Sequence, residues 1–154
     1  MSHGTRSLLL TVLAVVILGV TGAALRSWLT VAPVLLAVPA PDCDLRLGPC
    51  TARFADGGEV TLEVEPRGIP VARPLTFRLT TRGLTADTVA LDLVAVDMDM
   101  GYNRPSLVPA GPGVYRGQGM LPVCVRRRMT WEARVLLTTR GGLVAAPFRF
   151  DTGR

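Results

Sequence analysis

The sequence contains one histidine, His3, and no lysine. The 17 residues that carry a positive charge at pH 7 are all arginine. His3 precedes the long apolar N-terminal segment, so it is remote from the rest of the chain. Beyond that segment no histidine metal site, histidine-activated nucleophile or histidine general base can form. The glycine-rich stretches precede no helical pattern, which excludes a phosphate-binding loop. Asp97 and Asp99 have the pattern of solvated polar positions. We therefore expect a protein that is not an enzyme.

Clustered charge is also scarce, although the formal net charge is +5. Within residues 42–154 there are 15 arginines against 12 acidic residues, and they are spread along the chain. Only Arg126, Arg127 and Arg128 form a run, and a solvated loop explains that run better than an anionic or lipid partner. Nucleic-acid binding needs a basic patch, so we expect no nucleic-acid partner.

The longest apolar segment covers 18 uncharged positions, residues 8–25, and is flanked by Arg6 and Arg26. As a helix it would be about 27 Å long, close to the thickness of a bilayer's hydrocarbon core. A cleaved signal peptide is the alternative, but the chain continues with a second apolar stretch instead of a polar one. We therefore predict a retained single-pass anchor in residues 1–26.

Residues 27–41 contain three prolines, which exclude a second long helix, and Trp28, a residue suited to a membrane interface. We interpret them as a juxtamembrane stalk. Residues 42–154 are long enough for one small domain with its own core. Cys43 and Cys50 lie near its start with six residues between them, and such a pair outside the cytoplasm indicates a disulfide. Pairing of either residue with Cys124 is the alternative.

The cysteine pair also gives the expected topology. We predict an inner (cytoplasmic) membrane protein with its C-terminal domain in the periplasm or otherwise outside the cell. Thiol exchange at Cys124 is a weaker hypothesis, since no Cys-x-x-Cys motif is present to lower a thiol pKa.

Short alternating segments separated by glycine and proline predict an all-β domain, an immunoglobulin-like antiparallel sandwich of about seven strands. In residues 89–99 the apolar alternation changes face, which predicts either a bulge near 92–94 or a strand buried on both faces. Met98 and Met100 would then share one side of that strand. The predicted strands cover residues 51–54 and 60–64 (a pair or one bulged strand), 75–81, 89–99, 106–109, 114–119, 131–138 and 144–150.

After the initiator, every methionine lies within residues 98–129, and Cys124 lies among them. Thioether and thiolate sulfurs are soft ligands that select Cu(I), whereas the competing interpretation is that methionines fill gaps in the core. Met129 shares the inward face of Trp131 and is expected in the core. Met120 shares a face with polar residues and is poorly explained as core. For Met98 and Met100 both interpretations stay open.

The run MDMGYNRPSLVPAGPGVYRGQGMLPVCVRRRMTWEARVLL resembles the signature half of small membrane-anchored YtkA-like and FixH-like domains, which are similar in architecture to CopC-type copper carriers. The LPVCVRRR stretch departs from the usual pattern. The resemblance implies an extracytoplasmic immunoglobulin-like domain for copper handling or for assembly of copper-containing respiratory oxidases. Positions that match the pattern are Met98, Met100, Gly101, Pro105, Gly113, Tyr115, Met129 and Trp131.

Our leading hypothesis is a membrane-anchored Cu(I)-binding protein that passes its ion to a copper-receiving or respiratory-oxidase partner by ligand exchange. The alternative is a metal-free anchored adapter that docks a membrane complex, for example through the loop at Tyr102, and uses its methionines for packing. The candidate metal ligands are Met98, Met100, Met120 and Cys124.

Overall fold

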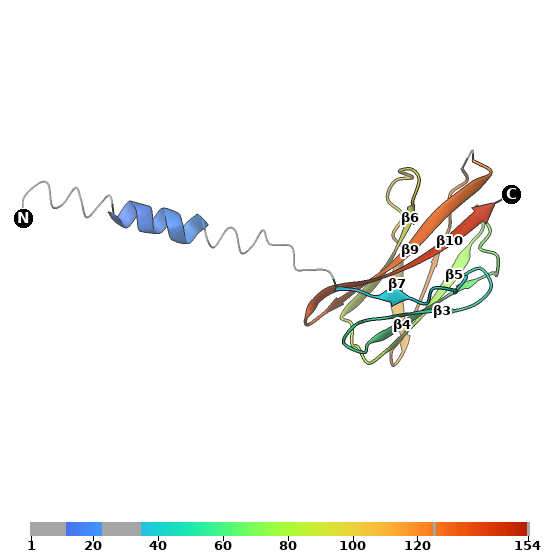
Figure 1. The fold of residues 1–154 in the computed structure, drawn as a ribbon, viewed down its shortest axis with the longest axis horizontal. Coiled ribbons are helices and arrows are strands. Elements are labelled where there is room, and N and C mark those ends of the chain that lie inside the picture. The colour runs from blue at the N-terminus through green and yellow to red at the C-terminus, as the bar shows by residue number, and fades with distance from the viewer. Residues whose placement is uncertain (1–11, 23–34, 125, 154) are drawn as a thin grey trace, which may run out of the picture. The chain divides into compact units, whose positions relative to one another are not determined.

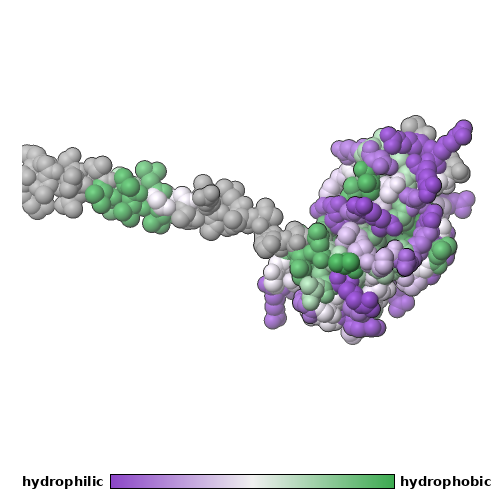
Figure 2. Space-filling view, in the orientation of Figure 1, coloured by the Kyte–Doolittle hydropathy of each residue, from purple (hydrophilic) through white to green (hydrophobic). Residues whose placement is uncertain are grey.

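The computed structural model describes residues 12–22, 35–124 and 126–153. The chain divides into two compact units, Met1–Ala32 and Pro33–Arg154. In the first unit residues 12–22 form a helix with a hydrophobic surface (Figure 2). No helix among the described residues has both the length and the apolar character needed to cross a bilayer. Both ends of the predicted span, residues 8–11 and 23–25, and Trp28 lie outside the described residues.

The second unit is built of strands (Figure 1), which confirms the expected β-rich class. It has ten strands in one hydrogen-bonded order, β1-β10-β9-β6-β7-β8-β5-β4-β3-β2, instead of about seven, and is nearly barrel-like. The strands are β1 (Leu35–Leu36), β2 (Val38–Pro39), β3 (Cys50–Arg53), β4 (Glu59–Glu65), β5 (Leu75–Arg82), β6 (Thr88–Ala95), β7 (Ser106–Gly111), β8 (Val114–Gly119), β9 (Arg128–Thr139) and β10 (Gly142–Gly153).

The segment around Ala37 connects the two ends of this strand order. β1 pairs with β10 and β2 pairs with β3, and only Ala37 separates β1 from β2. Ala37 is buried, and its N–H donates to the carbonyl oxygen of Ala145 at 2.8 Å. These two short strands lie within the segment we assigned to the stalk. The β1–β10 pair is parallel, whereas the strand pairs within residues 42–154 are antiparallel, as predicted for that domain.

β7 joins the two halves of the order, because it pairs with β6 at Leu107 and with β8 at Val108 and Pro109. The crossing leaves no room for a side chain at Gly117 of β8. A Cβ atom there would lie 2.5 Å from Cδ2 of Leu107 and 2.6 Å from the carbonyl oxygen of Ser106. Glycine at this position therefore allows the close approach of the two strands.

One continuous core fills the space between the strands, and strict alternation explains which side chains enter it. In β5, for example, Leu75, Phe77 and Leu79 are buried, whereas Thr76 and Arg78 are exposed. Trp131 is the largest fully buried side chain. Met129 is only 3% exposed, which confirms its predicted place in the core. The outer surface in Figure 2 is mostly hydrophilic with separate hydrophobic areas.

β6 differs from its prediction, because it ends at Ala95 and not at residue 99. Its register with β9 is continuous from Thr88 to Ala95, so the predicted bulge near 92–94 is absent. Only one face is buried, so burial on both faces is also wrong. Beyond the strand Asp99 accepts a hydrogen bond from the Gly101 N–H at 2.8 Å, and Gly101 has φ 78°. This local turn competes with further strand pairing.

Candidate functional site

A loop of residues 96–105 follows β6, and hydrogen bonds and an ion pair at Asn103 and Arg104 hold the second half of the loop in place. The Leu93 N–H donates to the carbonyl oxygen of Asn103 at 2.9 Å, so the loop returns alongside β6. The side-chain amide of Asn103 donates to the carbonyl oxygen of Met120 at 2.9 Å. Arg104 forms an ion pair with Asp92 at 2.9 Å. The Asn103–Met120 bond joins the loop that carries Met98 to the segment after β8 that carries Cys124, and the other two bonds hold the loop to β6.

The structure brings two of the four predicted ligands together, Met98 and Cys124. The Cys124 thiol lies against the Met98 thioether, with 3.7 Å between Sγ and Sδ. Met98 is 37% exposed and Cys124 is half-buried, so solvent reaches the pair. The contact joins residues that are 26 positions apart in the sequence. It arises between two loops, whereas our prediction had placed Met98 and Met100 side by side on a strand.

The distance between the two sulfur atoms suits a shared ion. Zn²⁺ holds a cysteine sulfur at about 2.3 Å, so two sulfur ligands at a tetrahedral angle around an ion of that size lie about 3.8 Å apart. The observed 3.7 Å therefore needs little rearrangement. Cys124 would bind as the thiolate, so ion binding at this point releases a proton.

The other two predicted ligands do not take part in this sulfur contact. Met100 is partly buried and packs against the hydrophobic core. Met120 is 50% exposed, directly after β8, and its backbone is held by Asn103. In the described ranges no three His, Cys, Asp or Glu side chains form a potential metal-binding group.

The two flanks of the pair carry opposite charge, which the sequence did not reveal. Asp97 and Asp99, next to Met98, are exposed. Arg126 and Arg127 are also exposed and line, with Cys124, a small cavity of about 20 Å³ above Trp131. Arg128, the third arginine of the run, is instead paired with Asp151 at 2.6 Å, and its hydrogen bond lowers the pKa of Asp151.

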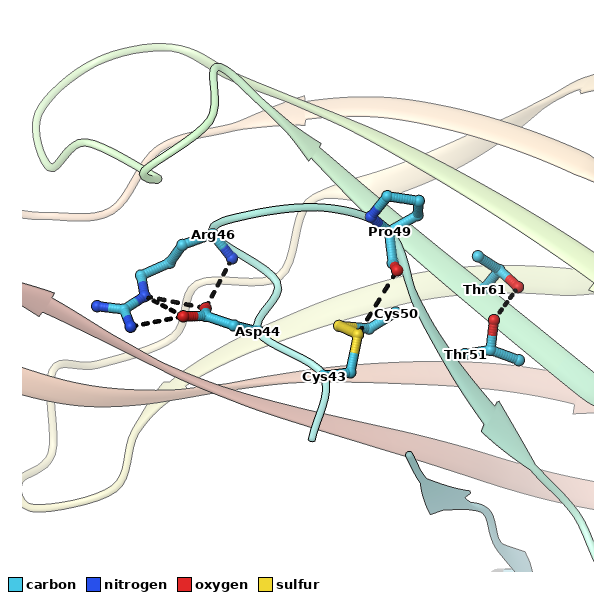
Figure 3. Close-up of a disulfide and its surroundings, with 7 residues drawn as sticks. All are labelled: Cys43, Asp44, Arg46, Pro49, Cys50, Thr51 and Thr61. Carbon is cyan, nitrogen blue, oxygen red and sulfur yellow. Dashed lines mark hydrogen bonds and ion pairs between the residues drawn. A yellow bond between two sulfur atoms is a disulfide. The ribbon is translucent and has the colours of Figure 1, made fainter. Parts of the chain in front are cut away.

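Cys43 and Cys50 form the disulfide, which confirms the preferred pairing, and Cys124 is a free cysteine. Figure 3 shows the short loop that the disulfide closes and two residues of that loop, Asp44 and Arg46, whose side chains bind each other. The carbonyl oxygen of Pro49 lies 3.5 Å from Sγ of Cys43. An oxidised sulfur has no hydrogen to donate, so this is a packing contact.

Away from the sulfur pair, Glu132 of β9 has an almost buried side chain between two arginines. Its carboxylate accepts hydrogen bonds from Arg134 at 2.6 Å and from Arg149 at 3.0 Å. Burial alone would raise the pKa of Glu132, but the two arginines outweigh it, so the pKa lies below the ordinary value of 4.5. The charged form is therefore stabilised on folding.

We expect Glu132→Gln to lower the free energy of unfolding by about 1–2 kcal/mol at neutral pH, because both arginines lose a charged acceptor. A lowered folded-state pKa contributes stability above the unfolded-state pKa, and this contribution is lost as the pH falls through the folded-state value. The difference between parent and variant should therefore disappear in acid, below pH 4.5. Urea unfolding from pH 7 to pH 3 measures it.

Glu63→Gln is the matched control, because Glu63 pairs with Arg67 at the surface. Its effect should stay below about 0.5 kcal/mol at every pH. A Glu132→Gln effect that does not change with pH would contradict the assignment of the lowered pKa.

Comparison of the chain with protein-family models, curated proteins and solved structures finds no match. The resemblance to YtkA-like and FixH-like domains thus depends on the residues quoted above.

Proposed function

We propose that this chain is a membrane-anchored periplasmic protein whose β-rich domain binds Cu(I) and passes it to a partner by ligand exchange. The process served is copper handling or the assembly of copper-containing oxidases. The observation that carries the proposal is the contact of the Cys124 thiol with the Met98 thioether at 3.7 Å. Thiolate and thioether sulfurs are the side-chain donors that favour Cu(I) over harder ions.

The exposure of the Met98–Cys124 pair favours a site that passes Cu(I) on over a site that stores it permanently. Because Met98 is more than one-third exposed, a ligand from a partner can approach the ion before the first ligands leave. Met100 and Met120 lie on the same two connecting segments as Met98 and Cys124, and we propose that they contact the ion only during transfer and not in the resting site. Transfer by ligand exchange changes no covalent bond of a substrate, in keeping with a protein that is not an enzyme.

The proposed location depends on the disulfide and on the N-terminal sequence. Disulfides persist in oxidising compartments such as the bacterial periplasm, and Cys43 and Cys50 form one. The uncharged run of residues 8–25 is the proposed anchor, and the bilayer is its partner. The finer architecture that we propose is the immunoglobulin-like sandwich of YtkA-like, FixH-like and CopC-type domains.

Competition with a Cu(I)-specific colorimetric chelator tests the proposal. The full chain is titrated in ascorbate, which keeps copper as Cu(I) and leaves the disulfide intact. We expect the parent to withdraw copper from the chelator, and Met98→Leu with Cys124→Ser to weaken binding by at least about 100-fold, since ligand loss exceeds the effect of losing outer-shell contacts. Met129→Leu is the control, because this buried methionine lies outside the pair. A parent that binds no copper, or a double variant that binds equally well, contradicts the proposal.

One observation favours the metal-free adapter as a second candidate. Tyr102, in the loop of residues 96–105, is 81% exposed, and the Arg104 guanidinium lies 5.2 Å from the centre of its ring. Such an exposed aromatic and arginine pair is typical of protein-binding surfaces. The adapter hypothesis predicts no copper binding and a lower melting temperature for Met98→Leu with Met100→Leu.

A further inference from the structure

We propose that one Cu(I) ion bridges two copies of this chain, each of which contributes Met98 and Cys124 across a two-fold axis. This inference depends on the proposed function, because it concerns the same sulfur pair. It identifies the first partner of the site as a second copy of the chain and predicts that copper controls the association.

The number of ligands is the first argument. One copy brings two sulfur atoms into contact, whereas a closed site for a soft d10 ion uses up to four. The chain neighbours of Met98 are Asp97 and Asp99, whose hard carboxylate oxygens suit Cu(I) poorly. Met100 packs against the core. A second identical pair on the exposed side completes a four-sulfur site.

The charges beside the pair are the second argument. Along each copy the order is acidic flank, Met98, Cys124, basic flank, where the acidic flank is Asp97 and Asp99 and the basic flank is Arg126 and Arg127. None of the ion pairs in the described part of the chain uses these four residues. A two-fold axis perpendicular to this line places the acidic flank of one copy opposite the basic flank of the other, so this is the axis that we propose. The surface is therefore self-complementary, as an isologous interface requires.

The apolar surface around the site is the third argument. Val96, Met120 and Val123 are each about half exposed in the loops that carry the pair. A few such side chains cover far less than the roughly 1,000 Å² that a stable interface buries. Without Cu(I) we therefore expect a monomer. With Cu(I) we expect a dimer that the metal–sulfur bonds hold together and to which these apolar side chains add a small contact area.

Native mass spectrometry of the full chain, released from detergent micelles in ascorbate, is the test. At half an equivalent of Cu(I) we expect the mass of two chains plus one copper, and monomers after a Cu(I) chelator is added. Copper bound to single chains at one equivalent overturns the inference but leaves the proposed function intact. No copper binding at all overturns the proposed function itself. A dimer that forms without copper, or one joined by a Cys124 disulfide on a non-reducing gel, also overturns the bridge.

Charge exchange tests the two-fold arrangement. The first variant, Asp97→Arg with Asp99→Asn, makes both flanks basic and keeps a side-chain oxygen for the turn at Gly101. The second, Arg126→Asp with Arg127→Asp, makes both flanks acidic. We expect each alone to lower the copper-dependent dimer fraction by at least about tenfold, and a mixture of the two to restore a heterodimer. Dimers of either variant that match the parent overturn the proposed arrangement.

Discussion

Trp131→Ala is expected to lower the free energy of unfolding by about 3–5 kcal/mol, the range for removal of a buried aromatic side chain. Trp131, on β9, is 1% exposed and belongs to the core. Its ring fills the space between the strands, and its indole N–H donates to the hydroxyl of Thr152 on β10 at 3.0 Å. The total stability of a domain of this size is about 5–15 kcal/mol, so this change removes a large part of it.

Urea unfolding followed by far-ultraviolet circular dichroism measures this effect. Thr152→Val separates packing from hydrogen bonding, because it leaves the indole N–H buried without its acceptor and should cost about 1–3 kcal/mol. Val108→Ala on the exposed side of β7 is the control, expected within about 0.5 kcal/mol. If Trp131→Ala costs no more than that control, the ring does not organise the core as described.

Removal of the disulfide, by Cys43→Ala with Cys50→Ala, is expected to cost about 2–3 kcal/mol. The bond closes a loop with a sequence separation of 7, and a loop this short restricts the unfolded chain by about that amount. Cys50 is also buried, so the shorter alanine side chain adds a small packing loss. Urea unfolding of the oxidised parent, the reduced parent and the double variant gives the values.

Cys124→Ala is the matched control for this change, because Cys124 is a free cysteine and only half-buried. We expect it to cost less than about 1 kcal/mol. Reduction should destabilise the parent and Cys124→Ala alike, and should leave the double variant unchanged. Equal effects of the two cysteine changes would show that the loop closure contributes nothing.

The β-rich class could be predicted because alternation of apolar and polar residues is a local property. β5 and β8 were found at nearly their observed bounds, and Met129 was correctly assigned to the core from its spacing to Trp131. β1 and β2 were missed, since two-residue strands have no period to detect. They exist because their neighbours β10 and β3 present backbone groups that they can pair with.

The candidate site was also predictable only in part. The sequence grouped the sulfur residues within a short stretch, and the preferred Cys43–Cys50 pairing followed from their proximity. The end of β6 at Ala95 was not predictable from apolar alternation, which continues to Met100, because the turn at Asp99 and Gly101 replaces strand pairing. That turn puts Met98 in a loop, from which it reaches Cys124.

Composition and periodicity alone thus determined that the chain is β-rich, that it lacks histidine and lysine chemistry after residue 3, and which residues supply sulfur. Only the tertiary structure decided that Met98 meets Cys124, because this contact joins two loops 26 positions apart. It also decided that opposite charges flank the pair. A local pattern specifies which face of a strand is buried, whereas the meeting of two loops depends on hydrogen bonds, such as that from Asn103 to Met120, that form only once the sheet has assembled.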